Sequence, residues 1–232
     1  MKHLITLLLI ISGGYYAQAQ TGTPAGTSKL LGKAGSLNIR VTVQSPSAQE
    51  TPLQIVCLFE YTENDLTNSP PALPAAVNGM VHVDKALKGL ITELRSSGKF
   101  AGHALETLIL IPPPGSIPAK RLLLIGLGNR KDFNPELMTS VGRVGMREAL
   151  QLGVSSYAHG SDLKDAGIDS PTGTVAVNVI KGAAEALETA QYLNGKQVGP
   201  APSITGLTLL AGPAFFVPTS EAVKTYLGQH PQ

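Results

Sequence analysis

A glycine-containing turn is the first segment of this chain whose residue types and spacing could do chemistry. An apolar run is followed by Gly126, Gly128, Asn129 and Arg130, and then by a helical pattern. A strand–turn–helix of this kind can present backbone N–H groups, assisted by a cationic side chain, to a phosphate. The dinucleotide fingerprint needs a third glycine where this chain has Lys131, so that motif is not met. The turn is a candidate anion site, with an ordinary structural turn as the alternative.

A second candidate is the loop from His159 to Asp165, which joins an expected strand to an expected helix. Ligand clefts in open α/β sheets form beyond the carboxyl ends of the strands. We therefore include His159 and Asp162 among the candidate ligand-binding residues. A metal site would use both of them with Asp165, but their spacing matches neither an EF-hand nor a zinc motif. A solvated loop is the simpler interpretation, and no metal or other cofactor is predicted.

Three further features are weaker candidates. Ser170 and Pro171 begin a helical pattern whose free N–H groups could hold an anion, although ordinary capping explains the same residues. Cys57 is the only cysteine and lies in an apolar run with no nearby base. We interpret it as a core residue rather than a nucleophile. A Ser/His/Asp triad has no fixed spacing in a sequence, and the chain has only five histidines.

The elements that would position these residues alternate between strand and helix patterns. Strands are predicted where apolar residues alternate or run continuously, at 37–43, 53–60, 107–111, 121–125, 154–157 and 204–210. Helices are predicted at 84–98, with Asp84 as N-cap and Gly98 as the stop, and at 134–152, 170–193 and 218–228. The interval 62–78 is predicted to be a surface loop. This alternation predicts a three-layer α/β/α sandwich with a mixed, largely parallel central sheet.

The N-terminus has the pattern of an export signal. A polar start, an apolar run at 4–11 and the triplet Ala17-Gln18-Ala19 predict a signal peptide over residues 1–19. The apolar run is shorter than the roughly 20 residues that a membrane-spanning helix needs. We expect an exported protein, periplasmic or extracellular, with no membrane attachment after cleavage. Residues 20–36 are predicted to form a flexible leader before a single domain at 37–232.

The charge balance excludes one class of function. The chain has 18 Lys and Arg residues against 16 Asp and Glu residues, and its formal net charge is +2. No segment gathers basic residues with interleaved aromatics, so nucleic-acid binding is not predicted. The interactions that remain are with another protein, with a second copy of the chain or with a small molecule.

Several segments together carry a family resemblance. They lie at 84–89, 98–102, 119–128, 133–136 and 184–192. Over roughly residues 37–210, this order of elements resembles the N-terminal, non-catalytic domain of the leucyl aminopeptidase (cytosol aminopeptidase) family. The resemblance implies a macro-domain-like fold. It also implies that the family's activity resides elsewhere, in a C-terminal domain that holds two divalent metals with Asp, Glu and Lys side chains.

The same resemblance argues against peptidase activity in this chain. The NTDAEGR-like segment that carries the family's catalytic Arg does not occur, and no Asp follows Asp169. A two-metal hydrolase needs several convergent carboxylates. We therefore predict a non-catalytic domain that acts by self-association or by binding a separately encoded protein partner. The alternative is a module that binds a nucleotide or an ADP-ribose-like molecule, and residual aminopeptidase activity is the least favoured hypothesis.

Overall fold

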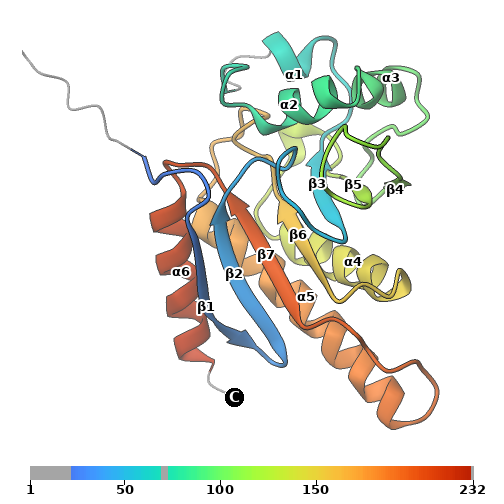
Figure 1. Cartoon of the computed structure of the whole chain (residues 1–232), viewed down its shortest axis with the longest axis vertical. Coiled ribbons are helices and arrows are strands. Elements are labelled where there is room, and N and C mark those ends of the chain that lie inside the picture. Colours follow the sequence, from blue (N-terminus) through green and yellow to red (C-terminus); the bar gives the residue numbers. More distant parts are fainter. Residues whose placement is uncertain (1–21, 69–72, 231–232) are drawn as a thin grey trace, which may run out of the picture.

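A mixed seven-stranded sheet forms the centre of the molecule (Figure 1). The computed structural model describes residues 22–68 and 73–230. Its strands are β1 (Ser28–Ala34), β2 (Leu37–Val43), β3 (Gln54–Leu58), β4 (Thr107–Leu110), β5 (Leu122–Gly126), β6 (Ser156–Gly160) and β7 (Gly206–Ala211). Their order across the sheet is β1-β2-β7-β6-β3-β5-β4. The five inner strands are parallel, and β1 and β4 pair antiparallel at the two edges.

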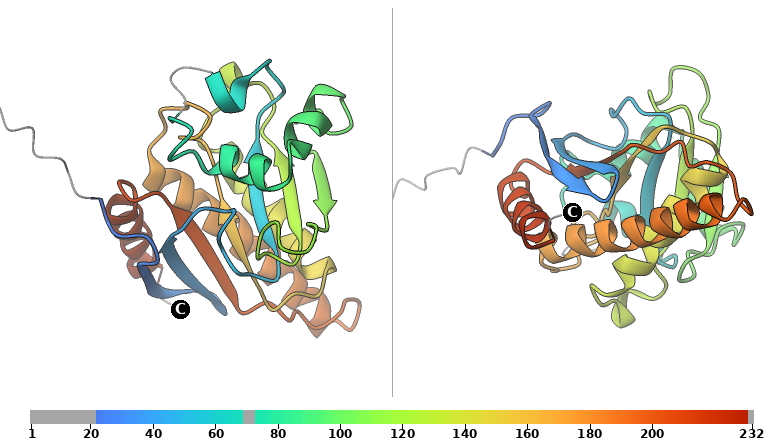
Figure 2. Two further views of the ribbon diagram at one scale, coloured as in Figure 1. Left: turned by 45° about the horizontal axis from the view of Figure 1, so that its top comes forward. Right: turned by 90° about the horizontal axis from the view of Figure 1, so that it is seen from below.

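Helices cover both faces of this sheet (Figure 2). One face carries α4 (Leu137–Gln151), α5 (Thr172–Gly195) and α6 (Phe216–Gln229), and the other carries α1 (Asp65–Asn68), α2 (Gly79–Ala86) and α3 (Leu90–Ser96). A short 3-10 helix, η1 (Arg130–Asp132), follows β5. The inner strand β3 serves two cores, since Ile55 and Cys57 pack toward α4 and α5 while Val56 and Leu58 pack toward α2 and α3. The predicted α/β/α sandwich is confirmed.

The strand β4 differs from its prediction. Its apolar run suggested a strand covered on both faces. Instead β4 is an edge strand, and among the described strands it pairs with β5 alone. Ile109 is 37% exposed and Ile111, just beyond the strand, is 81% exposed. An apolar run alone does not distinguish an inner strand from an edge strand.

The helix predicted from Asp84 to Gly98 is two helices. Asn78 caps α2, because its side chain accepts a hydrogen bond from the Val81 N–H at 3.0 Å. The chain then breaks at Lys88 and Gly89, whose φ angles are +57° and +86°. Asp84 therefore lies inside α2 rather than at a helix start. The predicted loop at 62–78 likewise contains the short helix α1.

Asp84 has a different role from the predicted cap. Its carboxylate accepts hydrogen bonds from the Thr92 N–H at 3.1 Å and from the Thr92 hydroxyl at 2.7 Å. It thus ties α2 to the first turn of α3. The predicted stop is confirmed, since Gly98 follows the end of α3 with φ +70°.

The interval 20–36, predicted to be a flexible leader, contains the strand β1. This strand pairs with β2 along its length, and the Ser28 and Thr42 hydroxyls lie 2.7 Å apart. Edge strands can expose polar side chains on their outer face, which is why a polar composition concealed this one. The predicted signal peptide at 1–19 lies outside the described residues. Among the helices that are described, none has the length and apolarity needed to cross a membrane.

Candidate functional site

A cavity of about 390 Å³ opens beyond the carboxyl ends of the parallel strands β2, β7 and β6. Its lining also comes from the start of α2, the loop between β6 and α5, and the starts of α5 and α6. The strands β6 and β3 are neighbours in the sheet. The chain leads from β6 to β7 on one side of this pair, and from β3 to β4 and β5 on the opposite side. Such a reversal of direction creates a crevice at the strand ends, where ligands bind in open α/β sheets.

Asp162 folds back over the end of β6 toward β3. Its φ angle is +55°, and its carboxylate accepts a hydrogen bond from the Cys57 N–H at 3.2 Å. That N–H is available because β3 pairs with β6 only as far as Val56 and Gly160. A Cβ atom on Gly160 would lie 3.0 Å from both carboxylate oxygens of Asp162. Glycine at this position therefore lets the carboxylate approach the end of the strand closely.

Asp165 joins the same loop to the start of α2. Its carboxylate accepts the Met80 N–H at 3.3 Å, and its backbone carbonyl accepts the Asn78 side-chain amide at 3.0 Å. Burial and mutual repulsion raise the pKa of Asp162 well above its usual value, and burial raises the pKa of Asp165 to about 6. In the part of the chain that the structure describes, neither carboxylate forms an ion pair with Lys or Arg.

His159 lies within β6 rather than in the loop predicted to contain it. It is 1% exposed and lines the cavity. Its Nε2 lies 3.8 Å from the Cys57 Sγ, while its buried Nδ1 has no hydrogen-bond partner among residues 22–68 and 73–230. Burial lowers the pKa of His159 to about 4, so the ring is neutral at neutral pH. A buried unpartnered nitrogen costs free energy, which makes it a candidate contact for a ligand.

Cys57 has the features of a core residue. It is 3% exposed, and burial together with the charge of Asp162 raises the pKa of its thiol well above the ordinary value. A nucleophilic cysteine needs a lowered pKa and access to solvent. The interpretation of Cys57 as a small core side chain therefore agrees with its surroundings.

The predicted turn at Gly126, Gly128 and Asn129 lies apart from the residues that line the cavity. A Cβ atom on Gly126 would overlap the carbonyl oxygen of His103, so the glycine lets the loop at 101–106 cross the end of β5. Gly128 donates its N–H to the Gly102 carbonyl at 2.9 Å. The Asn129 side chain accepts the Lys131 N–H of η1 at 3.0 Å. Each residue of the turn thus has a local structural contact.

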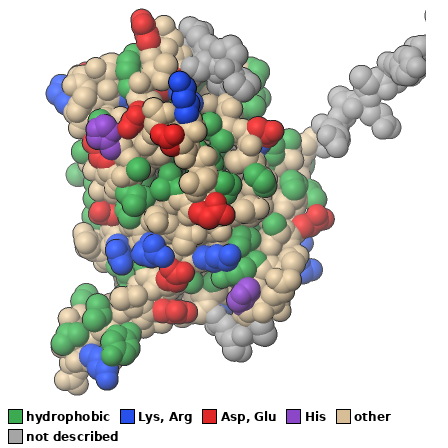
Figure 3. Space-filling view, turned by 180° about the vertical axis from the view of Figure 1, so that it is seen from behind, with side chains coloured by type: hydrophobic (Ala, Val, Ile, Leu, Met, Phe, Trp, Pro, Cys, Tyr) green, Lys and Arg blue, Asp and Glu red, His purple; other side chains and the backbone are tan. Residues whose placement is uncertain are grey.

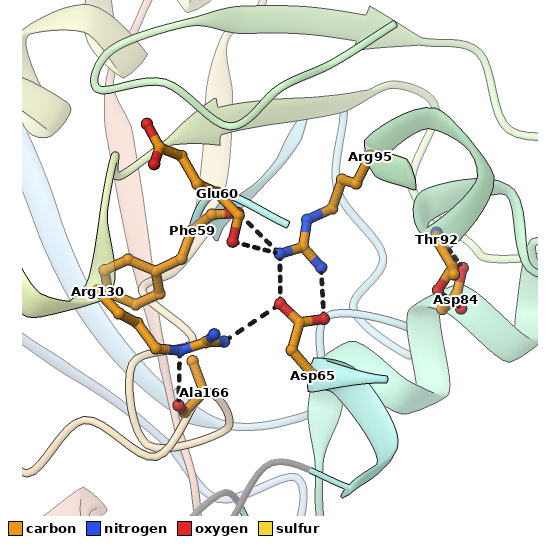
Figure 4. A network of polar contacts seen from close by, with 8 residues as sticks. All are labelled: Phe59, Glu60, Asp65, Asp84, Thr92, Arg95, Arg130 and Ala166. Carbon is orange, nitrogen blue, oxygen red and sulfur yellow. Dashed lines mark hydrogen bonds and ion pairs between the residues drawn. The ribbon is translucent and has the colours of Figure 1, made fainter. Parts of the chain in front are cut away.

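Arg130, the cation of that predicted site, joins a buried ionic network (Figure 4). Asp65 accepts two hydrogen bonds from Arg95, at 2.8 and 2.6 Å, and one from Arg130 at 3.3 Å. The side chains of Arg95 and Asp65 are 1% and 2% exposed. Arg130 also donates to the Ala166 carbonyl at 3.3 Å, and its guanidinium lies 5.3 Å from the centre of the Phe59 ring. The structure therefore brings His159 and Asp162 together but not Arg130 with them.

The sequence analysis identified only some of the residues that line the cavity. The start of α2 contributes Gly79 and His82, which were overlooked because the helix was predicted to begin at Asp84. Asn78 before an apolar run is a recognisable N-cap pattern and could have identified this start. The weaker candidate Ser170 does line the cavity. No group of three or more His, Cys, Asp or Glu side chains among the described residues is arranged to hold a metal.

The sheet order and the helices on both faces define a macro-domain-like α/β/α domain. Residues 66–195 match the N-terminal domain of the cytosol aminopeptidase family. The chain belongs to that family, as its sequence resemblance implied. The match is to the domain that precedes the peptidase domain.

Proteins of similar sequence or similar fold are known. A probable cytosol aminopeptidase of Thermosynechococcus vestitus is 35% identical over 100 residues, which cover 41% of this chain and 18% of the relative. A mutant of tomato leucine aminopeptidase superposes with a TM-score of 0.57 at 17% identity, covering 83% of this chain and 36% of that one. The Trypanosoma brucei macrodomain in complex with ADP-ribose gives a TM-score of 0.55 at 12% identity, covering 80% of this chain and 68% of that one. The chain thus spans less than a fifth of its aminopeptidase relative.

Proposed function

We propose that this chain is an exported, non-catalytic domain that binds a small molecule in the cavity at the strand ends. The observation that carries the proposal is the side chain of His159, which lines a cavity of about 390 Å³ and whose buried Nδ1 has no hydrogen-bond partner among the described residues. Small-molecule pockets typically span roughly 300–1,000 Å³ and combine apolar walls with a few convergent polar groups. The cavity supplies both, since Asp162 and Asp165 accompany apolar residues from β2, β7 and α5.

The fold suggests the first compounds to test. The Trypanosoma brucei macrodomain of similar fold has been solved with ADP-ribose. A nucleotide or an ADP-ribose-like molecule is therefore one ligand class for this cavity. One fold hosts many functions, so this likeness selects the test panel and does not by itself identify the ligand.

Interaction with a second protein, or self-association, is the second candidate function. The last turns of α5 project from the body of the molecule and carry hydrophobic side chains (Figure 3, lower left). Tyr192 is 64% exposed, Leu193 is 39% exposed, and Val198 just after the helix is 71% exposed. Apolar residues gathered on an exposed surface often mark interaction sites. Size-exclusion chromatography with light scattering on the protein and on the Tyr192→Ser variant tests this role. If the protein forms oligomers through this surface, the variant should be monomeric.

A thermal-shift screen followed by calorimetry tests the ligand-binding role. The panel holds ADP-ribose, ADP, amino acids and divalent metal ions. A ligand at about a hundred times its Kd should stabilise the fold by roughly 2.7 kcal/mol. Ser161→Phe places a large side chain at the cavity lining and should abolish the shift, whereas Ser96→Phe on the exposed surface of α3 should preserve it. Equal binding by both variants would contradict the cavity as the site, and no shift with any compound would favour the protein-interaction role.

A further inference from the structure

Two chemically different groups of residues line the cavity. The first is the acidic pair Asp162 and Asp165, neither of which forms an ion pair with Lys or Arg in the described part of the chain. Burial raises the pKa of Asp165, while the nearby charge of His82 lowers it. The nearest candidate cation on their loop, Lys164, is already bound to Asp169 at 2.7 Å, and its Nζ lies 5.8 Å from the centre of the Phe215 ring. The backbone N–H groups of Cys57 and Met80 each supply one hydrogen bond to this acidic pair. A carboxylate has about four acceptor positions, so both groups can accept more donors.

The second group is at the N-terminus of α5. This helix begins at Thr172 after Pro171, which has no side chain able to cap it, and no side-chain cap is found among the described residues. Its first N–H groups therefore remain available, and Ser170 and Thr172 line the cavity beside them. A helix of 24 residues carries a partial positive charge at this end. Backbone N–H groups at such an end bind carboxylate, sulfonate or phosphate groups.

His159 provides the independent sign that these two groups serve a ligand. It is 1% exposed, lines the same cavity and keeps its Nδ1 without a partner in the described residues. A neutral imidazole can donate or accept at this nitrogen, depending on its tautomer. Val175 and Leu209 line the cavity as well. A ligand that fits must therefore have polar ends and an apolar middle.

We infer that the cavity binds a zwitterion that carries an amine at one end and an acid group at the other. This inference rests on the proposed ligand-binding function and gives the ligand its chemical class. The ammonium group donates to Asp162 and Asp165, and the acid group accepts from the first turn of α5. The apolar middle contacts the aliphatic lining and the side chain of His159. A polyphosphate would instead place further negative charge beside Asp162 and Asp165.

Calorimetry with simple probes tests the inference. The probes are the ω-amino acids from β-alanine to aminooctanoate, with hexylamine and hexanoate as controls that lack the acid or the amine. We expect one chain length to bind best and both controls to bind about tenfold more weakly or worse, because each loses a charge-assisted contact. Equal binding by aminohexanoate and its two controls would overturn the inference, and so would no binding by the whole series.

Two variants and one further ligand separate the possible failures. Asp165→Asn keeps the shape of the side chain but removes its charge, and it should weaken binding of the best ω-amino acid about tenfold. Asp132→Asn changes an exposed aspartate of η1 and should leave binding unchanged. Binding of ADP-ribose without binding of any ω-amino acid would overturn the zwitterion and leave the proposed function standing. Binding of neither class would count against both.

Discussion

Asp65 lies between two guanidinium groups, whereas Asp162 and Asp165 lie together and form no ion pair with Lys or Arg among the described residues. Both places are buried and both hold the chain together across distant segments. In the first, Arg95 and Arg130 supply three hydrogen bonds to one carboxylate. In the second, the hydrogen bonds found among the described residues come from backbone N–H groups. A carboxylate held by two guanidinium groups indicates a structural role, and carboxyl groups without such partners beside a cavity indicate a site.

The largest expected effect is a loss in the free energy of unfolding when the pairing of Asp65 with its two arginines is broken. Arg95→Met removes two hydrogen bonds to Asp65 and leaves the carboxylate with the longer contact to Arg130. Breaking a buried pair by removing one partner costs about 3–5 kcal/mol of the free energy of unfolding. Urea denaturation measures this loss. Arg143→Met is the matched control, because its partner Glu185 is 53% exposed, and it should cost less than about 1 kcal/mol.

The turn that follows β5 gives the next largest effect. Gly126→Ala would drive a Cβ atom into the His103 carbonyl, so we expect a loss of about 1–3 kcal/mol in the free energy of unfolding. Gly206→Ala in β7 meets only an ordinary contact, with the Ser156 Cβ at 3.5 Å, and serves as the control. Thermal denaturation of both variants separates a structural glycine from a tolerant one. Equal stabilities of the two variants would mean that the structure does not require glycine at position 126, and the turn would again be a candidate ligand site.

The Asp165→Asn substitution should change the free energy of unfolding in the opposite direction from Arg95→Met. Asp165 faces Asp162 and His82, and its pKa is raised from 3.8 to about 6. The stability that this group contributes is full below pH 3.8 and is lost as the pH rises through about 6. The variant should therefore be more stable than the native chain by about 1 kcal/mol at neutral pH, and this gain should shrink as the pH falls below 6. Urea denaturation over the pH range measures it, and destabilisation at neutral pH would contradict the comparison.

The smallest effect concerns two unpartnered polar groups. The Nδ1 of His159 and the hydroxyl of Tyr157 both lack a partner among the described residues, but only His159 lines the cavity. His159→Leu and Tyr157→Phe should each change the free energy of unfolding by less than about 1 kcal/mol, because an unsatisfied polar group is removed. Only His159→Leu should weaken ligand binding. Loss of binding in both variants would mean that the effect does not depend on a direct contact between His159 and the ligand.

The sequence predicted the layers of the fold well because they follow from local patterns. Continuous apolar runs marked the inner strands β3 and β5. Asn134, predicted to be the N-cap of the helix, lies in the turn just before α4, where its side chain accepts the Leu137 N–H at 3.1 Å. The break at Lys88 and Gly89 was missed because the apolar period continues across it. The strand β1 was missed because its pairing with β2 is a tertiary contact that its own residues do not signal.

The candidate site was predictable only in part. A position beyond a strand end pointed to His159 and Asp162, and both line the cavity. The same reasoning selected Arg130, but the structure pairs it with Asp65, a residue 65 positions away in the chain. Long-range ionic partners of this kind leave no periodic pattern. The approach of α2 to the loop at Asp165 was hidden for the same reason.

The most direct test of this account is an NMR titration of the aspartate carboxyl groups by ¹³C chemical shift. The account predicts that Asp165 titrates near 6 and that Asp162 also titrates above its usual range, because burial and mutual repulsion oppose ionisation. It further predicts that aminohexanoate lowers both pKa values, because its ammonium group favours the ionised carboxylates. Titration of both groups in the ordinary range near 3.8, unchanged by the ligand, would contradict the claim that this pair is part of a ligand-binding site.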